Sequence, residues 1–95
     1  EERIAMALEE LIVQIEALGL VAERFSGEPE GLIGGTSKTI HKGIAVYSHS
    51  FSIVQAANGW SLLLSLQGQF TREIKLGGLD EAIRPICDCY SVSEG

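Results

Sequence analysis

The fold is decided by residues 51–90, FSIVQAANGWSLLLSLQGQFTREIKLGGLDEAIRPICDCY, which the sequence predicts to be two successive β-hairpins followed by a helix. Asn58-Gly59 stands between two β-prone runs and is a strong short-range hairpin signal, because both residues tolerate the positive φ angles of a two-residue turn. A loop made of these two residues pairs Ala57 with Trp60. It also predicts the pairs Gln55 with Leu62, Ile53 with Leu64, and Phe51 with Leu66.

Side chains alternate across a strand, so this hairpin has one large apolar face and one face of small and hydroxylated residues. A three-residue loop, Gln67-Gly68-Gln69, keeps the next strand in step by pairing Leu66 with Phe70, Leu62 with Ile74 and Trp60 with Leu76. A two-residue loop would turn Glu73 and Lys75 into the core, where an unpaired charge costs several kcal/mol. The predicted core face contains Phe51, Ile53, Trp60, Leu62, Leu64, Leu66, Phe70 and Ile74.

Residues 1–18 are predicted to form an amphipathic helix, because apolar residues recur at helical spacing on one side. Gly19 follows the last periodic residue and is expected to end the helix in the left-handed conformation. The apolar stripe contains Ile4, Ala7, Leu8, Leu11, Ile15 and Leu18. Glu2, Glu9 and Glu16 form a column on the opposite side, and Met6 and Val13 flank that column.

The segment between the helix and the hairpins is predicted to be mostly irregular. A short strand is expected within residues 20–25, and residues 26–43, rich in Gly, Ser, Thr, Glu and Pro, are interpreted as a long flexible connection. Antiparallel strands are then expected over residues 44–76. The apolar positions change parity between Val46 and Phe51, so either a bulge near Ser48-His49-Ser50 re-aims the chain or two strands meet there at a bend. We favour the bulge.

Residues 79–90 are predicted to form the second helix. Pro85 is compatible with it if the true helix begins near Arg84-Pro85 or if the helix kinks there. The predicted fold is therefore a single α+β domain, residues 1–95, with an N-terminal amphipathic helix, an antiparallel meander of three or four strands and a C-terminal helix. Both helices are expected on the apolar sheet face. This order of elements in a small acidic chain is similar to that of secretion-chaperone-like folds, a likeness of architecture alone.

The net charge of −6 is concentrated in the first third of the chain. Residues 1–30 hold eight Glu against two Arg, whereas the acidic and basic residues of 31–95 balance. An acidic surface disfavours direct nucleic-acid binding, which needs Lys and Arg at the phosphates. No apolar run approaches the roughly 18 residues that span a bilayer, and no signal-peptide pattern is present. We expect a cytoplasmic protein that binds neither nucleic acid nor membrane. The chain opens on Glu1 rather than Met, which leaves room for an upstream segment.

Catalytic, cofactor and metal signatures are weak, and we expect no catalytic residue, cofactor or metal site. Cys87 and Cys89 diverge by about 200° on a helix, so a shared metal ion would require His41 or His49 to approach. A Ser–His pairing at His49 is disfavoured because neighbouring strand residues point to opposite faces. The segment 31–39 resembles a phosphate-binding loop only superficially, since Ser37 and not Gly precedes Lys38.

Three hypotheses of function follow. The leading one is a non-enzymatic protein-interaction module of adaptor, chaperone or inhibitor type, acting as a homodimer. The second is a small-ligand binding protein with a pocket between the sheet and residues 26–43. The third is an acidic inhibitor that mimics nucleic acid. The candidate interaction surface consists of Met6, Val13, Glu2, Glu9 and Glu16 on the first helix and of Val54 and Leu63 on the Ser-rich sheet face.

Overall fold

A computed structural model describes residues 7–25, 27–66 and 69–90. These residues form an α+β fold in which antiparallel strands are enclosed in sequence by two helices. The elements are α1 (Leu8–Ala17), β1 (Val21–Arg24), β2 (Gly31–Gly35), β3 (Ser37–His41), β4 (Ile44–Ser48), β5 (Phe51–Ala56), β6 (Gly59–Leu66), β7 (Gln69–Leu76), the single 3₁₀ turn η1 (Leu79–Glu81) and α2 (Ile83–Tyr90).

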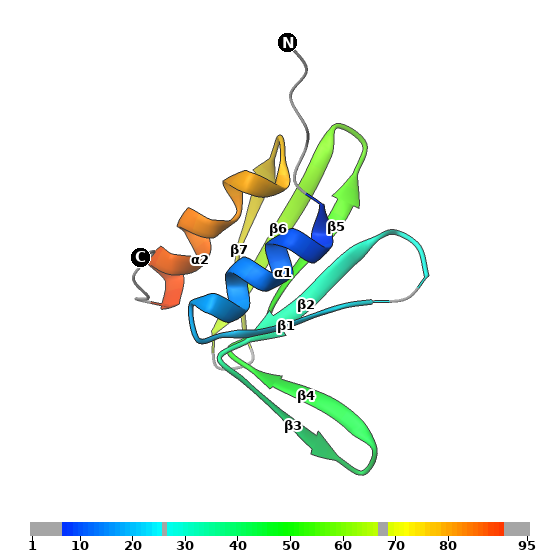
Figure 1. Cartoon of the computed structure of the whole chain (residues 1–95), viewed down its shortest axis with the longest axis vertical. Coiled ribbons are helices and arrows are strands. Elements are labelled where there is room, and N and C mark those ends of the chain that lie inside the picture. Colours follow the sequence, from blue (N-terminus) through cyan, green and yellow to red (C-terminus); the bar gives the residue numbers. More distant parts are fainter. Residues whose placement is uncertain (1–6, 26, 67–68, 91–95) are drawn as a thin grey trace.

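The main sheet has five strands in the order β1-β2-β5-β6-β7, and every neighbouring pair is antiparallel. β3 and β4 form a separate two-stranded sheet that leaves the lower end of the main sheet in Figure 1. The number of strands exceeds the predicted three or four, because β1 and β2 extend the meander and β3–β4 adds a second sheet.

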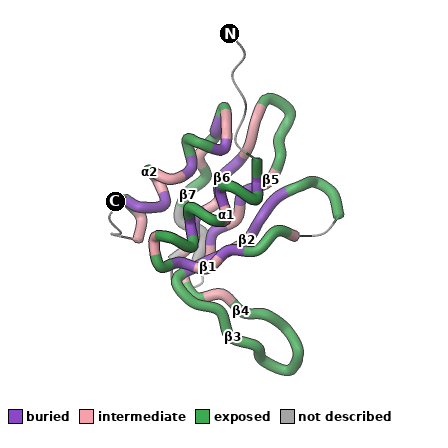
Figure 2. Tube along the Cα trace, viewed as in Figure 1, coloured by how far each residue is buried: buried purple, intermediate pink, exposed green. Residues whose placement is uncertain are grey.

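One core lies between the main sheet and both helices. It joins Leu11 and Ile15 of α1 and Ile86 of α2 with Ile53 and Leu62 of the sheet, all of them fully buried. Figure 1 shows α1 crossing in front of the sheet, and Figure 2 shows the buried residues gathered beneath it. Of the predicted core face, Phe51, Ile53, Leu62 and Leu64 are buried, Trp60 and Ile74 are partly buried, and the side chains of Leu66 and Phe70 lie outside the described residues.

The β5–β6 hairpin forms where it is predicted, but with partners shifted by two residues. Ala56 pairs with Gly59 and Ile53 with Leu62, so the turn consists of Ala57 and Asn58 rather than Asn58 and Gly59. Gly59 instead lies in the ladder at φ 138°, where an added Cβ would sit 2.2 Å from the carbonyl oxygen of Leu76. A side chain cannot occupy that space, so the glycine belongs beside β7. A two-residue shift leaves the apolar face unchanged.

The β6–β7 ladder confirms the predicted pairs of Leu62 with Ile74 and of Trp60 with Leu76. The predicted pairing of Leu66 with Phe70 is wrong, because the register shifts between Leu64 and Ser65 and Leu66 pairs with Gln69. Such a bulge absorbs one residue on one strand. Of the predicted loop, Gln67 and Gly68 lie outside the described residues.

The interpretation of residues 26–43 as a long flexible connection is wrong, since they contain β2 and β3. The glycines of β2 reflect close packing rather than looseness. A Cβ on Gly34 would lie 2.1 Å from the carbonyl oxygen of Val21 and 2.8 Å from the ring of Phe51. The favoured bulge near His49 is also replaced by the other alternative: β4 and β5 belong to different sheets and meet at a bend, where His49 has φ 50°.

The helix ends follow the predicted chemistry. Gly19 has φ 90° and ends α1 in the left-handed region. Of the predicted helix 1–18, residues 1–6 lie outside the described part of the chain. η1 and α2 divide the predicted helix 79–90, so that Pro85 falls in the first turn of α2. Proline is tolerated there because first-turn N–H groups have no partner within the helix.

Candidate interaction surface

The β3–β4 hairpin, residues 37–48, is the most exposed regular structure in the described chain, and we call it the arm. Every residue of β3 is exposed, and in β4 only Tyr47 is half-buried. The exposed fractions of Ile40, Ile44 and Val46 are 65%, 67% and 48%. Figure 2 shows exposure continuing along both strands. An isolated two-stranded hairpin is at best marginally stable in water, yet this one also presents three β-branched apolar side chains to solvent.

The arm is the distal half of one long hairpin whose proximal half is the β2–β5 pair. Gly34 lies opposite Phe51 in the main sheet and Ser37 lies opposite Ser48 in the arm, so the offset between partners is the same on both sides of the bend. The tip is a two-residue turn of Lys42 and Gly43, with φ 53° and 79°. Positive φ at both positions identifies the type I′ turn that fits the twist of a hairpin.

The bend between the arm and the main sheet is held by side chains. Thr36 donates to the Ser48 carbonyl oxygen from its backbone nitrogen at 2.9 Å and from its hydroxyl at 3.2 Å, and this hydroxyl lies 3.3 Å from Nδ1 of His49. The Tyr90 hydroxyl, at the end of α2, donates to the carbonyl oxygens of His49 and Ser50. Burial raises the pKa of Tyr90 and keeps it a donor. His49 therefore takes part in the hydrogen bonds that hold the bend.

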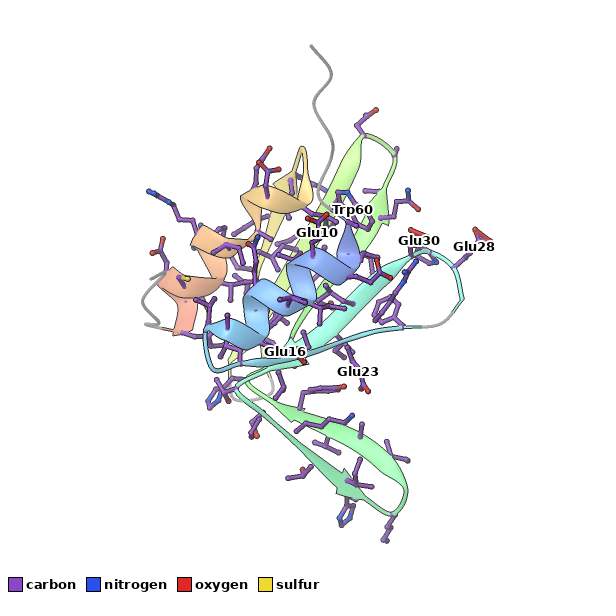
Figure 3. All side chains as sticks on the ribbon, in the orientation of Figure 1. Glu10, Glu16, Glu23, Glu28, Glu30 and Trp60 are labelled. Atoms are coloured by element: carbon purple, nitrogen blue, oxygen red, sulfur yellow. The ribbon has the colours of Figure 1, made fainter. Side chains whose placement is uncertain are left out.

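Glu23 of β1 connects the arm to the main sheet. Its carboxylate accepts from Nζ of Lys38 at 2.9 and 3.0 Å and also from the hydroxyl of Tyr47. Figure 3 shows Glu23 on the side of β1 nearer the arm. The hydrogen bond from Tyr47, followed by that from Lys38, lowers the pKa of Glu23. Burial and the bond to Glu23 raise the pKa of Tyr47 to about 12. These contacts fix the direction in which the arm leaves the sheet.

The outer edge of β4 has unpaired backbone groups and carries no charge. A two-residue turn closes on a hydrogen-bonded pair, here His41 and Ile44. Bonding then alternates along an antiparallel ladder, so the N–H and C=O groups of Ala45 and Tyr47 point away from β3. The strand reads IAVYS, without charge or proline. An exposed apolar edge of this kind is a template for pairing with another strand.

One of the two edge strands of the main sheet, β7, has the opposite character. β7 reads QFTREIKL and includes Arg72, Glu73 and Lys75. All three are exposed, and the Lys75 ammonium lies 3.0 Å from the Glu73 carboxylate. Charged residues, Lys above all, are a usual protection of sheet edges against unwanted pairing. The two edges therefore differ in their readiness to accept another chain.

The predicted Ser-rich sheet face is the one without helices. Val54 and Leu63 are half-buried on it, the Ser50 and Ser65 hydroxyls lie 3.0 Å apart, and Ser61 donates to Glu73 at 2.6 Å. This last bond is the first cause of the lowered pKa of Glu73. An open hollow of about 280 Å³ lies over β2, β5 and β6. Its lining residues are Ile33, Ser50, Phe51, Ser52, Leu63, Leu64 and Ser65.

The predicted acidic surface of α1 is present in part. Val13 is 65% exposed, and Glu9 and Glu16 are exposed beside it. Glu9 forms an ion pair with Arg24, which also binds Glu30 at 3.1 Å. A backbone hydrogen bond, followed by the bond from Arg24, lowers the pKa of Glu9.

Glu2 and Met6 of this surface lie outside the described residues. The remaining candidates do not form one patch. α1 packs on the sheet face that carries Ile53, and strand alternation places Val54 and Leu63 on the reverse face.

A larger hollow of about 500 Å³ lies between β7 and α2. It is lined by Arg72, Ile74, Lys75, Leu76, Asp80, Glu81, Arg84, Pro85 and Asp88, a mixture of cations, carboxylates and apolar groups. This is not the predicted pocket, because no residue of 26–43 lines it. Within residues 26–43, only Ile33 contributes to either hollow described here.

Neither Cys87 nor Cys89 forms a disulfide bond. Cys87 is buried in α2, and burial raises the pKa of the partly exposed Cys89, which makes its thiolate less available. Within residues 7–25, 27–66 and 69–90, no group of three or more His, Cys, Asp or Glu is placed to hold a metal ion. His41 lies at the tip of the arm and His49 at its bend, on different elements from the cysteines. Segment 31–39 is two strands rather than a strand–loop–helix phosphate site.

The interaction surface predicted from the sequence does not include the arm. The sequence does contain a signal for this hairpin: Lys42-Gly43 could form a two-residue turn, and it stands between the short runs TIH (39–41) and IAV (44–46). No helix in the described ranges is long and apolar enough to cross a membrane. Comparison with protein-family models, with curated proteins and with solved structures returns no match to this chain.

Proposed function

We propose that this protein is a non-enzymatic protein-interaction module of adaptor, chaperone or inhibitor type, and that the arm is its binding element. The observation that carries the proposal is the exposure of Ile40, Ile44 and Val46, at 65%, 67% and 48%, on a sheet of only two strands. Contact with a partner would remove this apolar surface from water and stabilise a hairpin that is marginal alone.

The contacts at the base of the arm support the same function. Glu23, Lys38 and Tyr47 hold the proximal part of the arm against β1, whereas the apolar side chains near the tip remain exposed. A surface held in one orientation loses less conformational freedom on binding than a flexible loop does. The arm is therefore preorganised for binding. We also place the protein in the cytoplasm, where thiols outside disulfide bonds, such as those of Cys87 and Cys89, stay reduced.

The test compares two exposed apolar side chains on different surfaces. Ile40 on the arm and Val13 on α1 have the same exposed fraction, 65%. Tagged wild-type protein, Ile40→Ser and Val13→Ser are each used to capture partners from the native host, and the amount of each specific partner is measured. We expect Ile40→Ser to lose the partner and Val13→Ser to keep it.

The opposite result would transfer the function to the acidic surface of α1. Retention by both variants would contradict binding through either surface. Circular dichroism spectra of both variants should match that of the wild type, because both side chains are exposed and surface substitutions seldom change stability by more than about 0.5 kcal/mol.

A second candidate is the binding of a small ligand in the hollow between β7 and α2. Its volume of about 500 Å³ lies within the usual range for ligand sites, and its mixture of charges suits a zwitterionic ligand. A thermal-shift screen of amino acids and related metabolites tests it. A ligand at about one hundred times its dissociation constant stabilises by about 2.7 kcal/mol, and Asp88→Asn should remove the shift.

The acidic-mimic hypothesis remains a prediction with a separate test. A mimic would need free carboxylates to stand for phosphates, whereas Glu9 and Glu30 share Arg24 and Glu23 binds Lys38. Glu16 is the exposed carboxylate of α1 to test first. Inhibition of a nucleic-acid-binding enzyme that is lost in Glu16→Gln, with the fold intact, would favour the mimic over the arm.

A further inference from the structure

We propose that the outer edge of β4 binds a second copy of this chain, with the two β4 strands antiparallel about a two-fold axis that passes beside Val46. This inference rests on the proposed function, because it identifies one partner of the arm, a partner held at the β4 edge rather than through Ile40 of β3. The pairing joins two arms into one four-stranded sheet in the order β3-β4-β4-β3.

The distribution of charge selects β4 and not β3 as the pairing edge. β4 is uncharged, whereas β3 carries Lys38 and the tip carries Lys42. Two β3 strands side by side would bring like charges together, which destabilises a cross-strand contact. Pairing through β4 places both sets of cations on the outer strands. The cationic β3 strands then protect the edges of the new sheet, as Lys residues do in other sheets.

The backbone of β4 is complementary to itself. Its outward N–H and C=O groups belong to Ala45 and Tyr47, two positions equally spaced from Val46. A two-fold axis at Val46 therefore places Ala45 opposite the partner's Tyr47, and Tyr47 opposite the partner's Ala45. Each of these pairs exchanges two hydrogen bonds. The contact is isologous, so it closes at a dimer and leaves no further copy of the same edge exposed.

The side chains fit the same register. Ile44 and Val46 lie on one face of β4, and the two-fold axis makes Val46 and the partner's Val46 direct neighbours in a close, non-hydrogen-bonded position. The two copies of Ile44 extend this into one apolar stripe. Val46, at 48% exposure, and Ile44, at 67%, would both lose solvent contact. A sheet of four strands also removes the weakness of the isolated pair.

The first experiment measures dimerisation by sedimentation equilibrium over a wide range of chain concentrations. Val46→Lys places two ammonium groups opposite each other at the axis, and we expect it to raise the dimer dissociation constant by about tenfold or more. Thr39→Lys is the matched control. Thr39 is the β3 partner of Val46 and shares its face, so it adds the same charge one strand further from the axis. We expect this control to remain dimeric.

The second experiment tests whether loss of the dimer in Val46→Lys comes from misfolding rather than from charge repulsion at the axis. Val46→Glu alone should weaken the homodimer in the same way, but a mixture of Val46→Lys and Val46→Glu should form a heterodimer, because opposite charges then meet at the axis. Native mass spectrometry distinguishes the heterodimer from both homodimers. Ala45→Pro removes an outward N–H without breaking the β3–β4 ladder, and we expect it to be monomeric.

Three results would overturn the inference: a monomeric wild type, a Val46→Lys variant as dimeric as the wild type, or a mixture that gives no heterodimer. They are distinguishable from failure of the proposed function. A monomer that still captures a different protein through Ile40 keeps the arm as the binding element and removes the second copy as its partner. A dimer that Val13→Ser abolishes, and arm substitutions do not, contradicts both proposals.

Discussion

The two halves of the long hairpin, β2–β5 and β3–β4, have one register but opposite surroundings. Ile53 in β5 is fully buried beneath the helices, whereas Ile44 in β4 is 67% exposed, although both are isoleucines in antiparallel strands. The difference comes from what lies over each half: α1 and α2 pack on the proximal half, and neither packs on the distal half. Strand formation and burial are therefore separate properties in this chain, and the arm has the first without the second.

The largest expected effect separates the two isoleucines. Ile53→Ala should lower the free energy of unfolding by about 2–5 kcal/mol, because it leaves a cavity in the core. Ile44→Ala should change it by less than about 0.5 kcal/mol at low chain concentration. Urea unfolding followed by circular dichroism measures both. An equally large loss in Ile44→Ala would show that the arm is packed against the main sheet after all.

The next effect concerns the junction between the halves. A Cβ on Gly35 would lie 2.3 Å from the Ser48 carbonyl oxygen, so Gly35→Ala must displace the backbone, at a cost of about 1–3 kcal/mol. Amide chemical shifts should change at the bend and along the arm. Gly43→Asn is the control, since its Cβ has no neighbour within 4 Å and Asn tolerates positive φ. Equal perturbation by both substitutions would argue against close contact at the junction.

A smaller effect extends the comparison to the two outer edges. The side chain of Lys75 on β7 is 78% exposed, so Lys75→Val should change stability by less than about 0.5 kcal/mol. It removes one of the charges that protect this edge, and we expect light scattering to detect more self-association than in the wild type. Lys75→Arg keeps the charge and should behave as the wild type does. Association that is unchanged by Lys75→Val would mean that this charge is not what protects the edge.

The smallest effect is the pH dependence of the contacts at Glu23. The pKa of Tyr47 rises from 10.0 to about 12, so its contribution is complete below pH 10 and is lost as the pH rises through 12. The pKa of Glu23 is lowered, so its contribution is present above its usual pKa of 4.5 and is lost as the pH falls through its folded value. NMR titration of the Tyr47 ring measures the first change. In Glu23→Gln the Tyr47 pKa should fall towards 10, and an unchanged pKa would attribute the shift to burial alone.

The sequence predicts the faces of the main sheet better than its register. Both the predicted pairing of Ile53 with Leu64 and the observed pairing with Leu62 put these residues on one side, because the two registers differ by two residues. Apolar alternation cannot distinguish them. The choice depends on the approach of Leu76 to Gly59, a contact with a strand that comes later in the chain.

The β3 half of the arm is not predicted by the sequence, for a related reason. Composition marked residues 26–43 as irregular, but the glycines at 31, 34 and 35 lie where neighbouring rings and carbonyl groups leave no room for a side chain. The turn at Lys42-Gly43 lacks the Asn or Asp that usually identifies a type I′ turn. Of the candidate surface residues, the exposure of Val13 follows from its place outside the apolar stripe of α1. The exposure of Ile44 depends on the absence of a covering layer, which no local pattern reports.

The shared register of the hairpin makes the reach of the arm independent of the core. Each residue added to both β3 and β4 would move the tip outward by about 3.3 Å. Additions in pairs would preserve which side chains face each way, while β2 and β5 kept their partners. Length could therefore be adjusted to suit a differently shaped partner without a new fold. Selection or design can therefore lengthen or shorten the arm while the packed interior stays as it is.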